Sequence, residues 1–290
     1  MTEPTLFPES GFLRLRLDLA YDGTNFFGWG KQIDRRTIQG EVEIALEKLT
    51  RIPVATIVAG RTDAGVHALG QVIHVDIPDV ENGPYSEKIN WKFADLPFRL
   101  NRILDEDIRV LKASVAPPGF HARFSALRRH YEYKIVDGNQ TVDPLRRFDV
   151  ATWYRPLNLE LLNDASQLLL GEQDFAAFCK FRPGGTTIRN LQEFSWHRDE
   201  KGVLHATIIA DAFCYSMVRN LVGAVVCVAD GRFPIQWVKD VLDNRQRISD
   251  SMVFPGRGLT FMQVDYPSDS ELLSRIGQTL QRRNESEDEA

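Results

Sequence analysis

The chain has few cysteines and lacks a long apolar run. Its 290 residues include only Cys179, Cys214 and Cys227, which form no CxxC pair and lie in otherwise apolar stretches. We therefore expect buried thiols rather than disulfides or zinc ligands, and no structural metal. No apolar run approaches the roughly 20 residues that cross a bilayer, and the start MTEPTLFPES lacks the basic and apolar regions of a signal peptide. These absences predict a cytoplasmic protein without a membrane segment.

An excess of positive charge is also lacking. The formal net charge is -5 and the isoelectric point is near 5.7, so the chain as a whole gives no sign of a nucleic-acid partner. The distribution is uneven, however, because the tail NESEDEA is acidic while residues 120–134 carry four basic side chains against one acid. The four are Arg123, Arg128, Arg129 and Lys134, and the acid is Glu132. This segment is a candidate phosphate-contacting patch, although an ordinary solvated surface explains the charges equally well.

The hydrophobic pattern predicts mixed strands and helices. Apolar and polar residues alternate in FLRLRLDLA, as in a strand with one buried face, and Thr37 is expected to cap a helix that follows it. Further strands are expected at 54–59, 71–76, 107–116, 129–137, 187–197, 203–211 and 258–266, further helices at 91–104, 158–170, 214–230 and 235–243, and a loop at 78–90. Strict β-α alternation is missing, which favours an α+β fold with helices packed on antiparallel sheets.

The chain is long enough for one large or two small domains. The run PPG at 117–119 interrupts the pattern, so we place a boundary there. The prediction is an N-terminal α+β half over 1–116, a C-terminal α+β half over 117–267, and an acidic tail over 268–290 that is disordered at its end.

The stretch AGRTDAGVHA, residues 59–68, places charges at the end of a predicted strand. Gly60 and Gly65 have the spacing of a phosphate loop, but Val66 and His67 stand where such a loop needs Lys and Ser or Thr. The six histidines show no metal-ligand spacing either. Spacing alone leaves Asp63 as either the capping residue of an Asx turn or a catalytic carboxylate.

A second charge stands out because it is isolated. Arg219 is the only charged residue between Asp211 and Asp230, in a stretch whose apolar residues indicate a largely buried helix. An unpaired buried charge costs several kcal/mol, so an anionic partner is expected. That partner is a nearby carboxylate, a helix C-terminus, an active-site acid elsewhere in the chain, or a substrate phosphate.

Several segments together resemble the TruA family of tRNA pseudouridine synthases. In chain order the strong matches are AGRTDAGVHALGQV, FHARFSALRRHYEYKI, DAFCYSMVRNLVG and GLTFMQVDYP, and the weaker ones are YDGTNFFGW and RLNRILDEDIRV. The resemblance extends from about residue 13 to residue 267. It implies an isomerase that converts uridine to pseudouridine at positions 38 to 40, in the anticodon stem-loop of tRNA.

The resemblance also assigns roles to four residues. Asp63 matches the catalytic aspartate, which as nucleophile or base needs no cofactor, because the reaction involves neither redox change nor hydrolysis. Tyr131 matches an active-site tyrosine that lies against the target base, and Arg219 matches the arginine that pairs with the aspartate. Arg61 matches an arginine associated with extruding the target nucleotide, although a plain phosphate contact is the alternative.

The family fold has two α+β halves with antiparallel sheets and a central RNA-binding catalytic cleft, and the family works as a homodimer that binds tRNA across both subunits. The sequence departs from the family pattern at Gly30, Asp105 and His130, which affects expected RNA contacts rather than the four residues above. Two other classes remain possible. A noncatalytic tRNA-binding protein would not need Asp63, and a glycoside or nucleoside hydrolase would normally use two acids.

Overall fold

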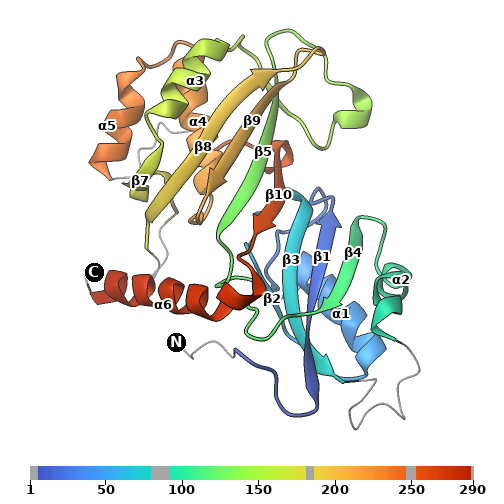
Figure 1. Cartoon of the computed structure of the whole chain (residues 1–290). Helices are drawn as coiled ribbons and strands as arrows, with labels where there is room; N and C mark the ends of the chain where they lie inside the picture. The colour runs from blue at the N-terminus through green and yellow to red at the C-terminus, as the bar shows by residue number, and fades with distance from the viewer. Residues whose placement is uncertain (1–5, 80–91, 181–185, 246–252, 289–290) are drawn as a thin grey trace. The chain divides into compact units, whose positions relative to one another are not determined.

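The computed structural model describes residues 6–79, 92–180, 186–245 and 253–288, which form two compact units (Figure 1). Unit 1 comprises Met1–Leu127 with Gln263–Gln281, and unit 2 comprises Arg128–Met262 with Arg282–Ala290. The chain thus passes from the first unit to the second after residue 127 rather than after 116, and residues 263–281 return to unit 1. The predicted loop at 78–90 lies, from residue 80 onward, outside the described residues.

Unit 1 is built on antiparallel strands with helices beside them. Its elements are β1 (Phe12–Tyr21), α1 (Ile38–Thr50), β2 (Thr56–Val58), β3 (His67–Pro78), η1 (Phe93–Asp95), α2 (Leu96–Asn101) and β4 (Ile108–Val115). Strand β1 pairs with β3 and β4, and β2 pairs with β3, all antiparallel. In Figure 1, α1 lies behind these strands. The alternation in β1 buries Leu15, Leu17 and Leu19 as predicted, and the Thr37 side chain caps α1 by accepting a bond from the N–H of Gly40.

Unit 2 repeats this kind of architecture with more helices. Its elements are β5 (Arg128–Asp137), η2 (Pro144–Arg146), β6 (Ala151–Trp153), α3 (Leu159–Gln167), β7 (Gly171–Asp174), η3 (Ala176–Phe178), β8 (Ile188–Arg198), β9 (Leu204–Ala210), α4 (Met217–Ala229), α5 (Gln236–Asn244) and η4 (Gly256–Gly258). Strands β5, β9, β8 and β7 pair in that order and are antiparallel, while the short β6 runs parallel to β5. Strand β10 (Leu259–Asp265) contributes residues to both units.

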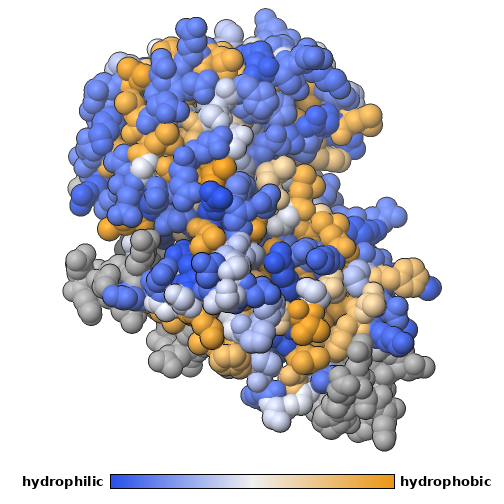
Figure 2. Space-filling view, viewed as in Figure 1, coloured by the Kyte–Doolittle hydropathy of each residue, from blue (hydrophilic) through white to orange (hydrophobic). Residues whose placement is uncertain are grey.

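The α+β class predicted from the sequence is confirmed. Helix α3 packs on β8 and α4 packs on α3, so the apolar side chains of the strands and of α4 are buried between them. Twelve of the thirteen residues of α4 are buried, and Arg219 is the exception. Polar side chains cover much of the face in Figure 2, with smaller apolar patches between them. None of the described helices has the length and hydropathy needed to cross a membrane.

The C-terminal tail is more ordered than predicted. After η5 (Asp269–Glu271), helix α6 extends from Leu272 to Asp288. Ser268 and Glu271 form a reciprocal capping box at the start of η5, which leads directly into α6, and Leu272 and Ile276 are buried one turn apart. Helix α6 thus covers most of the segment predicted as a tail, because an apolar stripe precedes the acidic residues and anchors the helix. Disorder at the very end stays a prediction, since residues 289–290 lie outside those described.

The expectation for the cysteines was wrong in part. Cys179 and Cys214 form a disulfide, whereas Cys227 is a buried thiol outside it, as predicted. The N–H of Lys180 donates to the carbonyl of Tyr215, which holds the two segments side by side. The Cα atoms of the two cysteines are consequently 5.7 Å apart, within the range that a disulfide needs.

Two buried histidines in unit 1 remain neutral. His74 on β3 and His121 in the segment after β4 have ring centroids 4.7 Å apart. Burial, together with the nearby charge of Arg14, lowers the pKa of His74 to about 2 and that of His121 to about 4. The Nδ1 atoms of both rings accept backbone hydrogen bonds, which requires the unprotonated form at that nitrogen.

We expect the free energy of unfolding to fall as the pH is lowered from 6.5. Both folded-state pKa values lie below the unfolded value of 6.5, so the unfolded chain binds protons first and is favoured by acid. Each histidine lowers the free energy of unfolding by an amount approaching ~1.4 kcal/mol per pH unit, and for His121 this decrease continues down to pH 4. Urea titrations at pH 7, 6 and 5 would measure the free energy of unfolding. His121→Asn should show a shallower dependence, and equal stability at pH 7 and pH 5 for the unaltered chain would contradict the expectation.

Candidate active site

The loop of residues 59–66 connects the antiparallel strands β2 and β3 in unit 1. The N–H of Val66 donates to the carbonyl of Asp63 at 3.2 Å, and Gly65 adopts a left-handed conformation with φ of 76°. The turn that presents Asp63 is therefore closed by main-chain geometry. Asp63 is half-buried and Arg61 is exposed, so the loop places a carboxylate and a guanidinium two residues apart at the end of a strand pair.

A second segment, residues 21–29, lies against this loop. The N–H of Trp29 donates to the carbonyl of Thr62 at 3.0 Å, and the N–H of Gly65 donates to the carbonyl of Phe26 at 3.4 Å. Gly28 has φ of 85°, and a Cβ there would lie 2.8 Å from the Thr62 oxygen. The motif YDGTNFFGW thus holds the Asp63 loop through its backbone, which only glycine permits at this distance.

Three buried polar side chains fasten the beginning of the loop. The hydroxyls of Tyr21 and Thr62 lie 2.8 Å apart, and the Gln71 amide donates to the Tyr21 oxygen and to the carbonyl of Gly60. Burial raises the pKa of Tyr21 to about 12, although its hydrogen bonds oppose this, so the phenol keeps its proton. A satisfied buried network of this kind restricts the loop to one conformation. Neither Tyr21 nor Gln71 was predicted as a site residue, although both lie in the segments that resemble the family.

Tyr131 belongs to unit 2, where it lies on β5 and is 7% exposed. Its ring meets those of Phe213 and Phe261 edge to face, with centroids 5.0 Å apart in both cases. The segment that leads into α4 therefore packs against β5 through the ring of Phe213. Aromatic contacts on two sides fix the orientation of the phenol ring.

Arg219 lies in the first turn of α4 and is half-buried. Its Nε donates to the carbonyl of Phe254 at 2.6 Å, and the N–H of Phe254 donates to the carbonyl of Arg219 at 3.2 Å. The neighbouring Asn220 is fully buried and its amide donates to the carbonyls of Phe178 and Ser216. The start of α4 is thus firmly held, and one guanidinium nitrogen of Arg219 has a carbonyl partner. Its pairing with an acid remains a prediction.

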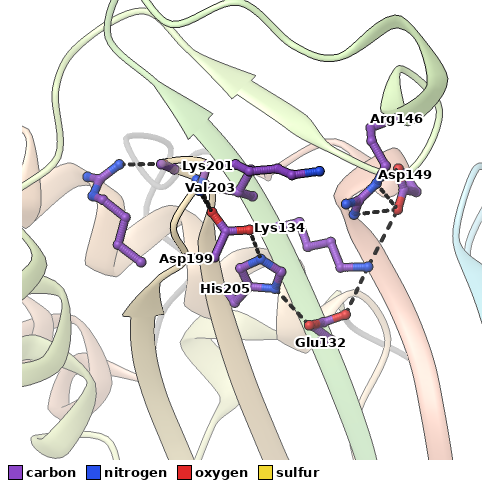
Figure 3. Close-up of polar contacts among 10 residues, drawn as sticks. Glu132, Lys134, Arg146, Asp149, Asp199, Lys201, Val203 and His205 are labelled. Atoms are coloured by element: carbon purple, nitrogen blue, oxygen red, sulfur yellow. Dashed lines mark hydrogen bonds and ion pairs between the residues drawn. The ribbon is translucent and has the colours of Figure 1, made fainter.

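The basic segment 120–134 does not form one patch. Side chains alternate along β5, so Arg129 is buried and binds the carbonyl of Asp211, while Lys134 lies on the opposite face. The Lys134 nitrogen is 2.9 Å from Glu132 and 3.5 Å from Asp149 (Figure 3). The interpretation as a single phosphate-contacting patch was therefore wrong for these two residues.

Lys134 is part of an ion-pair network on unit 2 (Figure 3). The His205 ring lies between Glu132 at 2.9 Å and Asp199 at 3.2 Å, and Arg146 binds Asp149 at 2.8 Å. Burial alone would raise the pKa of the Glu132 carboxyl, but hydrogen bonds from His205 and Lys134 lower it overall. These charges neutralise one another and so contribute little attraction for RNA. Over the residues described, no group of three or more His, Cys, Asp or Glu is arranged to hold a metal ion.

The geometry therefore defines a protein with a rigidly held, half-exposed aspartate next to an exposed arginine. A family model described as tRNA pseudouridine synthase matches residues 19–125 and 165–267. This chain belongs to that family of tRNA-modifying isomerases.

Individual relatives carry a more specific name. The chain is 49% identical to the tRNA pseudouridine synthase A of Frankia casuarinae, over 91% of this chain and 93% of the relative. It is 50% identical to the protein of that name from Streptomyces griseus, over 93% and 94%, and 48% identical to that from Mycobacterium leprae, over 95% and 96%. The resemblance stated from the motifs is thereby confirmed.

Proposed function

We propose that this chain isomerises uridine to pseudouridine at positions 38 to 40 of tRNA, with Asp63 as its catalytic carboxylate and no cofactor. The observation that carries the proposal is the Asp63 loop. Residues 21–29 and buried polar side chains hold this loop through hydrogen bonds. The chain also aligns with tRNA pseudouridine synthases over nearly its whole length. A site of this rigidity suits chemistry that depends on the exact placement of one functional group.

The reaction breaks the N-glycosidic bond of uridine, turns the detached uracil and joins its C5 to C1′ of the ribose. Atoms and electrons balance within one nucleotide, so an isomerase needs neither water nor an oxidant. A single carboxylate serves either as a nucleophile that forms a covalent intermediate or as a base. Asp63 is half-buried, so part of this residue is accessible to solvent or substrate while residues 21–29 hold its loop.

Three further residues have proposed supporting roles. Arg61 is exposed on the same loop as Asp63, and a side chain that fills the space of an extruded base lowers the cost of unstacking, about a few kcal/mol. Tyr131 is assigned to contact with the target base, in keeping with its fixed ring, and Arg219 to pairing with the Asp63 carboxylate. The hydroxyl of Tyr131 is a candidate to assist removal of the C5 proton.

Mapping of pseudouridine in tRNA tests the assigned position. Bulk tRNA from a strain that lacks this gene would be incubated with the purified protein, and pseudouridines would be located at single-nucleotide resolution. We expect new pseudouridines at positions 38, 39 and 40 and nowhere else. Modification confined to the D-arm or T-arm would show a different site preference, and tRNA binding without any modification would favour a noncatalytic protein.

We also propose that the protein acts in the cytoplasm as a homodimer. The homodimer is what the family resemblance implies, and the cytoplasmic location is the expectation stated from the sequence. Equilibrium sedimentation of the purified chain would test the second part by giving a mass of 33.0 kDa for a monomer or twice that value for a dimer.

A further inference from the structure

Side chains from elsewhere in unit 1 bind the backbone of the turn 120–126 at four of its seven residues. Arg14 donates to the carbonyl of Phe120, His74 accepts from the N–H of Ala122, Tyr266 donates to the carbonyl of Ala122, Thr279 donates to that of Phe124, and Arg275 donates to that of Ala126. These side chains come from β1, β3, the residues after β10, and α6. Connecting segments are usually more mobile than the elements that they join, so a turn with this many anchoring hydrogen bonds is unusual.

His121 stabilises the turn through hydrogen bonds to other residues of the same turn. Its Nδ1 accepts from the N–H groups of Arg123 at 3.3 Å and Phe124 at 3.1 Å, two and three residues ahead. The N–H of His121 donates to the Ser125 hydroxyl, and the N–H of Ser125 donates to the carbonyl of His121. His121 is 4% exposed and Ser125 is fully buried. The imidazole thus does what an asparagine oxygen does in an Asx turn, but from a buried position next to His74.

These hydrogen bonds place an exposed arginine on a backbone that is held in one conformation. Arg123 is exposed while its neighbours Ala122 and Ser125 are buried. The Phe124 ring stacks on the His121 ring at 4.5 Å, and the Arg123 guanidinium lies 5.4 Å from the Phe124 centroid. The side chain therefore projects from a backbone whose conformation is already determined, with an aromatic ring beside it.

We propose that Arg123 binds a backbone phosphate of the RNA substrate and that His74 and His121 are positioning residues for it. The inference rests on the proposed function, since it needs an RNA substrate. A guanidinium matches the geometry of a phosphate, and phosphates receive half or more of protein to nucleic-acid hydrogen bonds. A turn that is already ordered adds affinity because little backbone entropy is lost on binding.

Salt-dependent binding tests the contact. Affinity for one in vitro transcribed tRNA would be measured by fluorescence anisotropy at several KCl concentrations, with Asp63→Asn in every protein to prevent turnover. Arg123→Gln should weaken binding about tenfold at low salt and lower the log-log salt slope by roughly 0.7 to 0.9, the value for one phosphate. Lys48→Gln, at an exposed position on α1, is the matched control and should change neither quantity. An unchanged affinity and slope for Arg123→Gln would overturn the proposal.

The positioning role has its own test. His121→Leu removes the acceptor of the Arg123 and Phe124 N–H groups and should lower the salt slope as Arg123→Gln does. His121→Asn supplies an acceptor oxygen and should keep the wild-type slope. The double variant with Arg123→Gln should bind no more weakly than Arg123→Gln alone, because both changes affect one contact. If His121→Leu lowers the melting temperature but leaves the salt slope intact, the histidine is structural only.

Wild-type activity separates this inference from the proposed function. If the unaltered protein modifies positions 38 to 40 while Arg123→Gln binds normally, only the role of Arg123 is wrong. If the unaltered protein binds tRNA but does not modify it at those positions, the proposed function fails. The salt measurements then still show whether Arg123 contacts a phosphate.

Discussion

Asp63→Asn is expected to form no pseudouridine above background. The substitution keeps the size of the side chain and one oxygen that can accept a hydrogen bond, but removes the negative charge and nearly all basicity. The turn around Asp63 is closed by the Val66 N–H and by Gly65, both unaffected. We therefore expect the variant to fold, to melt within a few degrees of the wild type and to bind tRNA, while its rate falls by at least about 10³-fold, as when a catalytic nucleophile is removed.

Tritium release from tRNA labelled at C5 of uridine measures this rate directly. Asp34→Asn is a matched control, because Asp34 is exposed in unit 1 and has φ of 56°, a conformation that asparagine tolerates. It should retain wild-type activity. Substantial tritium release by Asp63→Asn would reduce Asp63 to a turn residue and leave the proposed chemistry without a carboxylate.

Most of the fold could be predicted from the sequence because it follows from local patterns. The alternation of β1, the Thr37 cap and the apolar helix α4 are each visible within about 15 residues, and the structure has all three. Strands β6 and β7 were missed because three and four residues are too few to show a period of two. The apolar spacing at the start of α6 is also present in the sequence, but no helix was predicted there, because only the acidic composition of the tail entered the prediction.

The candidate site was predictable only as far as its motif. Asp63 and Arg61 stand out in the sequence as charges between glycines, whereas Tyr21 and Gln71 are 50 residues apart and meet only in the folded chain. The same limit explains the disulfide, whose two cysteines are 35 residues apart. The opposite orientation of Arg129 and Lys134, by contrast, follows from the period of a strand and could have been inferred without a structure.

The second large effect is expected at Gly23, which lies against the end of the Asp63 loop. A Cβ at Gly23 would lie 2.0 Å from the carbonyl oxygen of Val66 and 2.6 Å from its carbon. Val66 immediately precedes β3 and is buried, and the N–H of Gly23 donates to His67 on that strand at 3.1 Å. Neither backbone can withdraw without breaking this bond or the pairing of β3.

We therefore expect Gly23→Ala to destabilise the protein by about 3 kcal/mol, as overpacking against an unyielding backbone does. The melting temperature should fall by at least about 5 °C. Activity should also fall at temperatures where the variant is folded, because a shift of about 1 Å in the Asp63 loop costs on the order of 10²-fold in rate. Gly30→Ala is the matched control for stability, since a Cβ there meets nothing within 4 Å, and it should leave the melting temperature unchanged. Calorimetry would measure the melting temperatures of both variants, and tritium release would measure the activity of Gly23→Ala. If Gly23→Ala and Gly30→Ala behaved alike, the close approach of residues 21–29 to the Asp63 loop would not be what holds that loop in place.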